Sequence, residues 1–291
     1  MLQMVRRIFT IILFSTALYG CSHLDLKGIL MPTGEGVEAR FKQSAAMNQD
    51  LKAGTVDVNE TYYVYVAADP HIDQTHKNLT SFNNDLRSDD KAGFGVILGD
   101  CTDVRDNLSN YLDALSYSSD IHKCNHDVFH ILGNHDLFFK GWEKFKESVG
   151  PSVYWFEAAY EGGKDLYISL DTATGTLGRN QTEWLKPFLA ENRAKYRHCI
   201  ILTHTNFFYT DTSQSSSGNM TIEESYSLLD LFGKHNVSLV LQGHDHYRED
   251  LTYDNVRYTV LGAISDKSEP AEYLKMKVDS DGISFDWILF K

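Results

Sequence analysis

The chain has 291 residues, of which 42% are hydrophobic and 23% are charged, as in ordinary globular proteins. This composition excludes a disordered chain, a collagen-like fibre and a membrane protein with several spans. The 40 acidic and 27 basic side chains give a formal net charge of -13, which argues against sequence-blind binding of nucleic acid. So negative a chain is also unfavourable for a phosphate-bearing substrate, unless bound cations change the local field.

The first twenty residues are expected to be a secretory signal peptide. Arg6 and Arg7 precede a mostly apolar run, 8–18, which falls short of the about 18 apolar residues that span a bilayer as a helix. The run ends in Leu18-Tyr19-Gly20-Cys21, which resembles the lipobox of bacterial lipoproteins. This resemblance implies a lipid on Cys21 that anchors the chain in a membrane, at the extracytoplasmic side of a bacterial cell envelope. The alternative is plain secretion, with the cysteine incidental.

The remaining chain divides into two regions. Residues 21–58 have weak periodicity and are expected to form an N-terminal tether or extension. Part of this region can also pack on the domain as a first strand or helix, and the sequence does not decide between these alternatives. Residues 59–291 are expected to form the functional domain.

From residue 61 onward, apolar β-rich runs alternate with helical segments. The predicted strands are 62–68, 94–98, 128–132, 199–202 and 237–241. The predicted helices are 79–86, 107–117, 138–149 and a segment that opens with a capping box at Thr221 and closes at Gly233. This alternation predicts an α/β layered domain, followed by hairpins at 250–263 and 271–291.

Polar side chains follow the apolar runs directly, where the predicted strands end. In open α/β sheets these ends share one edge, beyond which ligands bind. Imidazole and carboxylate groups together suit Zn, Mn, Fe or Co ions. The residues gathered in this way are Asp69, His71, Asp100, Asn134, His135, Asp136, His204, His244 and His246. We therefore expect a metal site at this edge, where Gly99, Gly133 and Gly243 permit sharp turns out of the strands.

The spacing of these residues indicates how they share metal ions. Asp69 and His71 stand two residues apart, so both side chains can point to one side and bind one ion. His244 and His246 have the same spacing. Asp100 has two carboxylate oxygens and can bridge two ions. Two ions about 3.5–4 Å apart can clamp a phosphoryl group for in-line displacement.

Read in order, the residues form five motifs: D-x-H at 69–71, GD-x-x-D at 99–103, GNHD at 133–136, a lone histidine at 204 and GH-x-H at 243–246. This order resembles that of the calcineurin-like metallophosphoesterases over about residues 61–250. The resemblance implies an α/β fold of two packed mixed β-sheets flanked by helices, with a dinuclear metal site at the strand ends. It also implies a metal-dependent hydrolase of phosphoric esters, a phosphatase or phosphodiesterase that acts on a small phosphoester.

The resemblance assigns a role to each matching position. The first metal would be held by Asp69, His71 and His246, and the second by Asn134, His204 and His244. Asp100 would bridge the two ions, which would be divalent or mixed-valence, such as Mn, Fe, Zn or Co, and would hold the hydroxide nucleophile. His135 would assist the leaving oxygen, and Asp136 would orient His135. Asp103 would support the site without binding metal.

Two other functions remain open from the sequence. The same metals would serve a nucleotide or lipid-headgroup pyrophosphate hydrolase. The chain could instead be a surface lipoprotein that binds metal or ligand without turnover. The His135–Asp136 pair argues against this last function, because binding alone needs no leaving-group acid.

Residues outside the motifs have simpler interpretations. Cys101, Cys124 and Cys199 are an odd number, and we expect them to be free and buried. His122, Cys124 and His126 lack an evident fourth ligand, which favours a polar loop over a zinc site. Asp171 also follows an apolar run, but the resemblance gives it no metal role.

Overall fold

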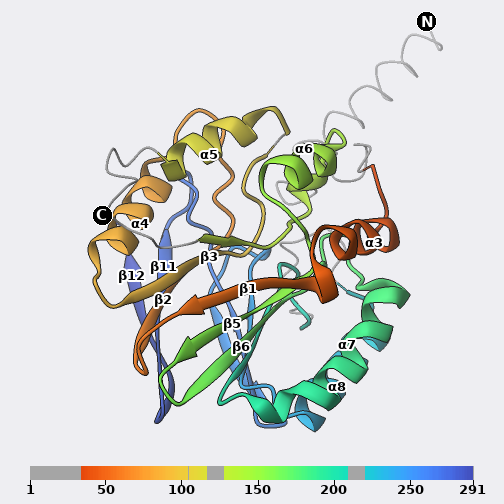
Figure 1. Cartoon of the computed structure of the whole chain (residues 1–291). Helices are drawn as coiled ribbons and strands as arrows, with labels where there is room; N and C mark the ends of the chain where they lie inside the picture. The colour runs from red at the N-terminus through yellow and green to blue at the C-terminus, as the bar shows by residue number, and fades with distance from the viewer. Residues whose placement is uncertain (1–33, 104, 117–127, 209–219, 291) are drawn as a thin grey trace, which may run out of the picture.

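The computed structural model describes residues 34–103, 105–116, 128–208 and 220–290. In this part of the chain, a seven-stranded and a five-stranded β-sheet pack against each other, and helices cover their outer faces (Figure 1). Both sheets contain parallel and antiparallel pairs. The expected fold class, two mixed sheets flanked by helices, is confirmed.

The five-stranded sheet has the order β12-β11-β2-β3-β4. Its parallel strands are β2 (Tyr62–Ala67), β3 (Ala92–Ile97) and β4 (Val128–His130). In the hairpin of β11 (Glu272–Asp279) and β12 (Gly282–Leu289), β11 pairs antiparallel with β2. The strands β2 and β3 are almost continuously apolar because the second sheet covers one face and helices cover the other.

The seven-stranded sheet has the order β1-β5-β6-β7-β8-β10-β9. Its strands are β1 (Lys52–Asp57), β5 (Tyr154–Tyr160), β6 (Gly163–Ser169), β7 (Cys199–Leu202), β8 (Leu239–Gln242), β9 (Glu249–Tyr253) and β10 (Val256–Val260). The strands β6, β7, β8 and β10 are parallel, so their carboxyl ends share one edge. A bridge between Ala68 and Ala263 brings this edge beside the end of β2.

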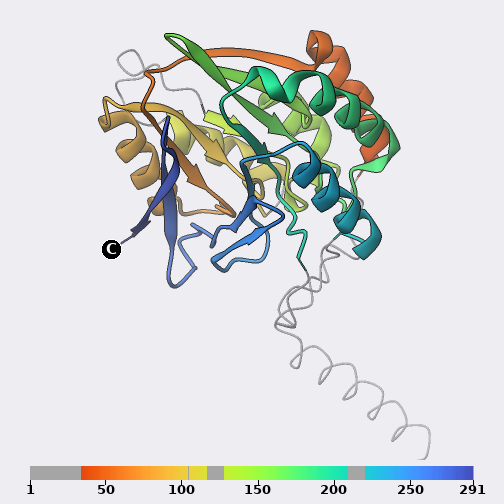
Figure 2. The same cartoon turned by 90° about the horizontal axis from the view of Figure 1, so that it is seen from below.

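Helices enclose the two sheets from outside. The five-stranded sheet is covered by α4 (Lys77–Ser88), α5 (Leu108–Ser116) and α6 (Gly141–Ser148). The seven-stranded sheet is covered by α7 (Gly178–Asn192) and α8 (Ile222–Lys234), with α3 (Val37–Met47) beside α7 (Figure 2). Short 3-10 helices are η1 (Gln49–Leu51), η2 (Arg105–Asn107), η3 (His135–Leu137) and η4 (Arg193–Lys195). Among the residues described, none of the helices is both long and apolar enough to cross a bilayer.

Aromatic side chains fill the space between the two sheets. Phe94 of β3 contacts Phe156 of β5 and Tyr167 of β6, with ring centroids 5.3 and 5.0 Å apart. All three rings are fully buried. Burying a side chain of this size stabilises the fold by about 1.5–3 kcal/mol relative to leaving it exposed. This layer holds the two sheets, and hence their carboxyl ends, in a fixed relation.

Residues 37–57 belong to the packed structure. They form α3, η1 and β1, and β1 pairs in parallel with β5 at the edge of the seven-stranded sheet. Of the two alternatives for the region 21–58, packing on the domain therefore holds for this part, and the packed structure begins before residue 59. The expected signal peptide, Cys21 and the rest of the expected tether up to residue 33 lie outside the described residues.

The predicted helices and hairpins lie close to their expected positions. The capping box is formed, because the Thr221 hydroxyl accepts a hydrogen bond from the backbone N–H of Glu224. The predicted end at Gly233 is wrong by one residue: α8 continues to Lys234, and Asn236 then adopts a left-handed conformation with φ 52°. Asparagine tolerates that conformation better than most residues, so glycine is not needed there.

Candidate metal centre

The candidate ligands lie in short turns just beyond the strands. Five of them have a positive φ, which residues other than glycine rarely adopt: Asp69 (53°), His71 (47°), Asp100 (51°), His244 (76°) and His246 (59°). Asp69 and His71 therefore lie in a turn and do not continue the strand, but their side chains converge on one point, as expected. Strained conformations of this kind cost about 1–3 kcal/mol each and gather at functional sites.

The three motif glycines serve two different purposes. Gly99 has a positive φ of 89°, so glycine is required there for its conformation. A Cβ atom on Gly133 would lie 2.1 Å from Oδ1 of Asp100, and one on Gly243 would lie 2.8 Å from Oδ2 of Asp69. Glycine is therefore needed at positions 133 and 243 because the carboxylates of Asp100 and Asp69 lie so close to the backbone there that they leave no room for a side chain.

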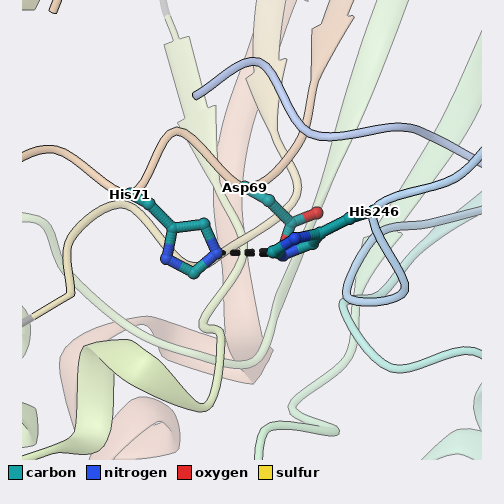
Figure 3. Close-up of side chains that lie close together, drawn as sticks. All are labelled: Asp69, His71 and His246. Carbon is teal, nitrogen blue, oxygen red and sulfur yellow. Dashed lines mark hydrogen bonds and ion pairs between the residues drawn. The ribbon is translucent and has the colours of Figure 1, made fainter. Parts of the chain in front are cut away.

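The first group of candidate ligands is Asp69, His71 and His246 (Figure 3). The Nε2 atoms of His71 and His246 lie 3.0 Å apart. Oδ1 of Asp69 lies 3.6 Å from Nε2 of His246 and 4.0 Å from Nε2 of His71. The turns that follow β2 and β8 thus bring two imidazoles and one carboxylate to one point (Figure 3).

The second group is Asp100, His204 and His244, all of them buried. Nε2 of His204 lies 3.4 Å from Oδ1 of Asp100 and 3.2 Å from Nδ1 of His244. The side-chain oxygen of Asn134 lies 3.0 Å from the same nitrogen of His204. These four side chains come from the turns after β3, β4, β7 and β8.

Asp100 faces both groups. Its Oδ1 lies 3.4 Å from Nε2 of His204, and its Oδ2 lies 3.7 Å from Nε2 of His71. Oδ1 also accepts a hydrogen bond from the backbone N–H of His135, at 2.8 Å, which fixes the orientation of the carboxylate. One carboxylate therefore connects the two candidate ligand groups.

Hydrogen bonds on the far side of the rings fix which nitrogen faces the site. Nδ1 of His204 donates to the carbonyl oxygen of Leu98 at 2.7 Å, so its Nε2 is left for the site. Nδ1 of His71 lies 2.8 Å from Oδ1 of Asp103, which orients that ring in the same manner. The supporting role expected for Asp103 agrees with this contact.

The charged groups of the site act strongly on one another. Burial by itself would lower the pKa of His204, but Asp100 outweighs it and raises the pKa to about 10. For His71, burial is again outweighed, here by Asp103 and Asp100, and the pKa rises to about 9. Burial and the nearby His204 lower the pKa of His244 to about 4. Burial would raise the pKa of Asp100, but the surrounding histidines hold it well below its usual range.

This set of donors fits two divalent cations. Oδ1 of Asp69 is buried and accepts no hydrogen bond from any of the described residues. A buried carboxylate oxygen without a partner is unfavourable, and a cation between Asp69, His71 and His246 would satisfy it. The second group combines imidazole nitrogens with carboxylate and amide oxygens, a mixture suited to Zn, Mn, Fe or Co.

The sequence itself carries a family signature over this region. A profile of the Metallophos family, described as calcineurin-like phosphoesterase, matches residues 62–248, more than half of the chain. The chain belongs to the calcineurin-like phosphoesterase family. It is therefore a hydrolase, and the matched region contains every motif residue identified above. No curated protein matches the sequence.

Several solved structures share the fold. A dimetal phosphatase from Danio rerio has a TM-score of 0.59 and 13% identity, over 79% of this chain and 99% of that one. A Plasmodium protein described as the anchor in the inner membrane complex has a TM-score of 0.58 and 13% identity, over 79% and 84%. A purple acid phosphatase from yellow lupin, Lupinus luteus, has a TM-score of 0.58 and 16% identity, over 79% and 51%. At these identities the similarity concerns the fold.

His135 lies next to the two ligand groups of this phosphoesterase. Its side chain is 20% exposed, and its Nε2 lies 3.9 Å from Oδ2 of Asp100. Its ring meets that of His71 edge-on, with centroids 4.7 Å apart, and lies 4.5 Å from the ring of Phe138. Nδ1 of His135 lies 3.7 Å from Oδ1 of Asp103.

The structure corrects the partner expected for His135. Asp136 was expected to orient that ring, but its two oxygens lie toward the backbone N–H groups of Thr102 and Gly133, at 3.4 and 2.9 Å. Successive side chains of a 3-10 helix point about 120° apart, so these neighbours diverge. Burial, reinforced by Asp100, raises the pKa of Asp136 to about 7. Asp136 therefore supports the turn beneath the site.

The residues outside the motifs agree with their simpler interpretations where the structure describes them. Cys101 and Cys199 are free and buried, as expected. Cys124, with His122 and His126, lies outside the described residues. Asp171 is fully buried and pairs with Arg40, a contact between residues 131 positions apart that no sequence signal indicates.

Proposed function

We propose that this protein hydrolyses small phosphoric esters with the help of two divalent cations. The observation that carries this proposal is the position of Asp100, whose two oxygens face His204 on one side and His71 on the other. A carboxylate shared by two groups of imidazoles is suited to hold two cations side by side. Membership of the calcineurin-like phosphoesterase family supports the same reaction.

The candidate ligands divide between the two cations. One would be held by Asp69, His71 and His246, the other by Asn134, His204 and His244, with Asp100 common to both. When bound, the cations would polarise the phosphoryl oxygens and promote ionisation of the attacking water. The protein contributes the fixed orientation of the rings, through Leu98 behind His204 and Asp103 behind His71.

His135 is proposed to act on the leaving oxygen. It is partly exposed, and its ring is held between His71 and Phe138. Its ligand atoms lie close to those of His71 and Asp103, and it belongs to neither the Asp69 group nor the Asp100 group that we propose to hold the cations. The carboxylate oxygens of Asp100 and Asp103 lie 3.9 and 3.7 Å from its Nε2 and Nδ1. A protonated imidazole in this position can stabilise or protonate the departing oxygen.

The excess of acidic side chains limits the size of the substrate but does not oppose the reaction. Bound ions are often the largest local charges of a site, so two divalent cations would dominate the field that a phosphate group meets. The remaining surface, with a net charge of -13 over the chain, disfavours long polyanions. A small phosphoester that reaches the metals is therefore the proposed substrate, with no nucleic acid as partner.

Hydrolysis of chromogenic esters tests this function. The purified protein, loaded in turn with Mn, Zn, Fe or Co, is incubated with p-nitrophenyl phosphate and with bis(p-nitrophenyl) phosphate. We expect nitrophenol release that a chelator abolishes and added metal restores, and the ratio of the two rates separates monoesterase from diesterase activity. If a protein with two bound metals cleaves neither ester, the proposal is contradicted. Faster cleavage of a nucleotide pyrophosphate would favour the alternative hydrolase instead.

We also propose that a lipid on Cys21 anchors the protein at a bacterial cell envelope, on the extracytoplasmic side. The support is the segment Leu18-Tyr19-Gly20-Cys21, which precedes the described residues. In a bacterial host fed with labelled palmitate, the protein should take up label and sediment with membranes, whereas Cys21→Ser should do neither. An unlabelled wild-type protein in the soluble fraction would contradict the anchor.

A further inference from the structure

We propose that Thr172 is a positioning residue of the metal centre, and that its hydroxyl holds His204 in place. This inference rests on the proposed function, since it takes His204 as a metal ligand. Thr172 lies just after the end of β6, which is the neighbour of β7 in the sheet, and His204 lies just after the end of β7. None of the five motifs contains Thr172.

The Thr172 hydroxyl uses all of its hydrogen-bonding capacity on the segment that carries His204. Its oxygen accepts the backbone N–H groups of His204, at 3.3 Å, and of Thr205, at 3.0 Å. A hydroxyl has two acceptor sites and one proton. The proton is therefore directed to the Thr203 hydroxyl, 2.7 Å away. All four of these residues are buried, so water does not compete for these bonds.

A return contact closes this arrangement. The Thr205 hydroxyl donates to the backbone carbonyl of Thr172 at 2.8 Å. The ring of His204 is fixed separately, because its Nδ1 donates to the carbonyl of Leu98 at 2.7 Å. Leu98 thus sets the rotation of the ring and Thr172 sets the position of its backbone. Both are needed for Nε2 to lie beside Asp100.

Helix α3 fixes Thr172 from the other side. The Arg40 guanidinium pairs with both oxygens of Asp171, at 2.8 and 2.9 Å, and both side chains are fully buried. The Gln181 amide holds the backbone of the same residue: the N–H of Asp171 donates to Gln181 Oε1, and Gln181 Nε2 donates to the Asp171 carbonyl. Thr172 therefore follows a residue that cannot shift easily.

Arg40, which holds Asp171 in place, lies outside the segment that matches the family profile. The family profile begins at residue 62, whereas Arg40 belongs to α3 (Val37–Met47). The N-terminal region of this chain thus contributes to its metal centre through Arg40, Asp171 and Thr172 in turn. We expect that loss of the Thr172 hydroxyl weakens binding of the cation at His204 and leaves binding of the cation at His71 and His246 unchanged.

Two matched variants separate positioning from general stability. Thr172→Val keeps the shape of the side chain but leaves two buried N–H groups without their acceptor. Ser44→Ala removes another fully buried hydroxyl, one that accepts the N–H groups of Ser152 and Val153 at 3.0 and 3.4 Å. Ser44 supports the segment that leads into β5 and touches none of the candidate ligands. Thr172→Ser restores the hydroxyl and serves as the rescue.

The measurement is a titration of the metal-free proteins with Co²⁺ alone, followed by visible absorption and by metal content. We expect Thr172→Val to bind one of its two Co²⁺ ions about 10- to 100-fold more weakly, the usual effect of losing a group that orients a ligand. Thr172→Ser and Ser44→Ala should bind both ions like the wild type, although Ser44→Ala should melt at a lower temperature. Wild-type binding and absorption bands in Thr172→Val would overturn the proposal. So would an equal loss of metal in Ser44→Ala.

The titration does not depend on the identity of the substrate. A wild-type protein that binds two Co²⁺ ions but hydrolyses no ester would contradict the proposed function, and the comparison of variants would still decide the role of Thr172. Conversely, an active wild type with unchanged metal binding in Thr172→Val would overturn the positioning role alone.

Discussion

The Nε2 atoms of His71 and His246 lie 3.0 Å apart, although 175 residues separate them in the chain. At this distance both nitrogens cannot carry protons that point at each other, so at least one of them presents its lone pair. A cation between the two rings would be bound by both lone pairs and by Oδ1 of Asp69, which accepts no hydrogen bond from the described residues (Figure 3). If the other Nε2 carries a proton, that proton must leave before a cation can bind both rings.

Metal binding should release protons near neutral pH. The pKa values of His71 and His204 are raised to about 9 and about 10, so in the metal-free protein at pH 7 both rings are protonated on both nitrogens and positively charged. Metal ligands must be neutral imidazoles, so binding displaces both protons, and affinity should rise with pH up to about 10, the higher of the two pKa values. His244, with its pKa lowered to about 4, is already neutral and contributes none. Calorimetric titration with Zn²⁺ in buffers of different ionisation enthalpy measures the number of protons released on metal binding. A number near zero at pH 7 would contradict the expectation.

The substitution Asp100→Asn should remove turnover together with metal. An amide has one oxygen in place of two and no charge, so it cannot face His204 and His71 at once as the carboxylate does. We expect activity to fall by at least about 100-fold and metal content to drop below that of the wild type. Asp245→Asn is the matched control, because Asp245 accepts a hydrogen bond from Asn206 and belongs to neither ligand group. Two retained metals in Asp100→Asn would argue against the bridging role.

The substitution His135→Ala should reduce turnover while two metals stay bound. The ring lies beside the ligand groups, 3.9 Å from Asp100, and loss of a leaving-group acid typically costs about 10²- to 10⁴-fold in rate. Metal content measured on the same sample separates this effect from loss of the centre. The loss should also be smaller for substrates whose leaving group is a weak base, since these need little protonation. A parallel fall of metal and activity would show that the role given to His135 is wrong.

The buried ion pair of Arg40 and Asp171 should matter far more for stability than an exposed pair of the same type. Arg40→Met leaves Asp171 buried without its charge partner, which typically costs about 3–5 kcal/mol. Arg179→Met is the matched control, because Arg179 and Glu183 form a pair whose side chains are 82% and 60% exposed. Exposed pairs contribute about 0–1 kcal/mol. The free energy of unfolding in denaturant measures both, and equal losses would contradict the assignment of burial as the cause.

The strands that carry the site could be predicted because their side chains are buried on both faces. The buried runs of β2, β3, β7 and β8 are short and apolar, so the polar residues that follow each run stand out in the sequence. The candidate ligands can therefore be located without knowledge of which strands are neighbours. The order of the motifs then indicated the family, and the family profile agrees.

Other elements depend on partners that are distant in sequence. Glu157 lies in the middle of β5 and is buried, which the sequence pattern of a strand does not favour. Lys52 of β1, Lys164 of β6 and Tyr196 satisfy its carboxylate, at 2.7, 2.5 and 2.8 Å. The helix α7 contains Pro187, which by itself predicts a break. Neither β5 nor α7 could therefore be assigned from local preferences alone.

The sequence by itself determined the chemistry of the centre, because the kinds of side chain and their places after buried runs are local properties of the chain. Only the tertiary structure decided how these side chains are oriented. The left-handed turns at Asp69 and Asp100, the contact of Asp136 with Thr102 and the support of His204 by Thr172 all involve segments far apart in the chain. Such contacts form only when the two sheets pack, since a turn is held in a strained conformation by its neighbours and not by its own sequence.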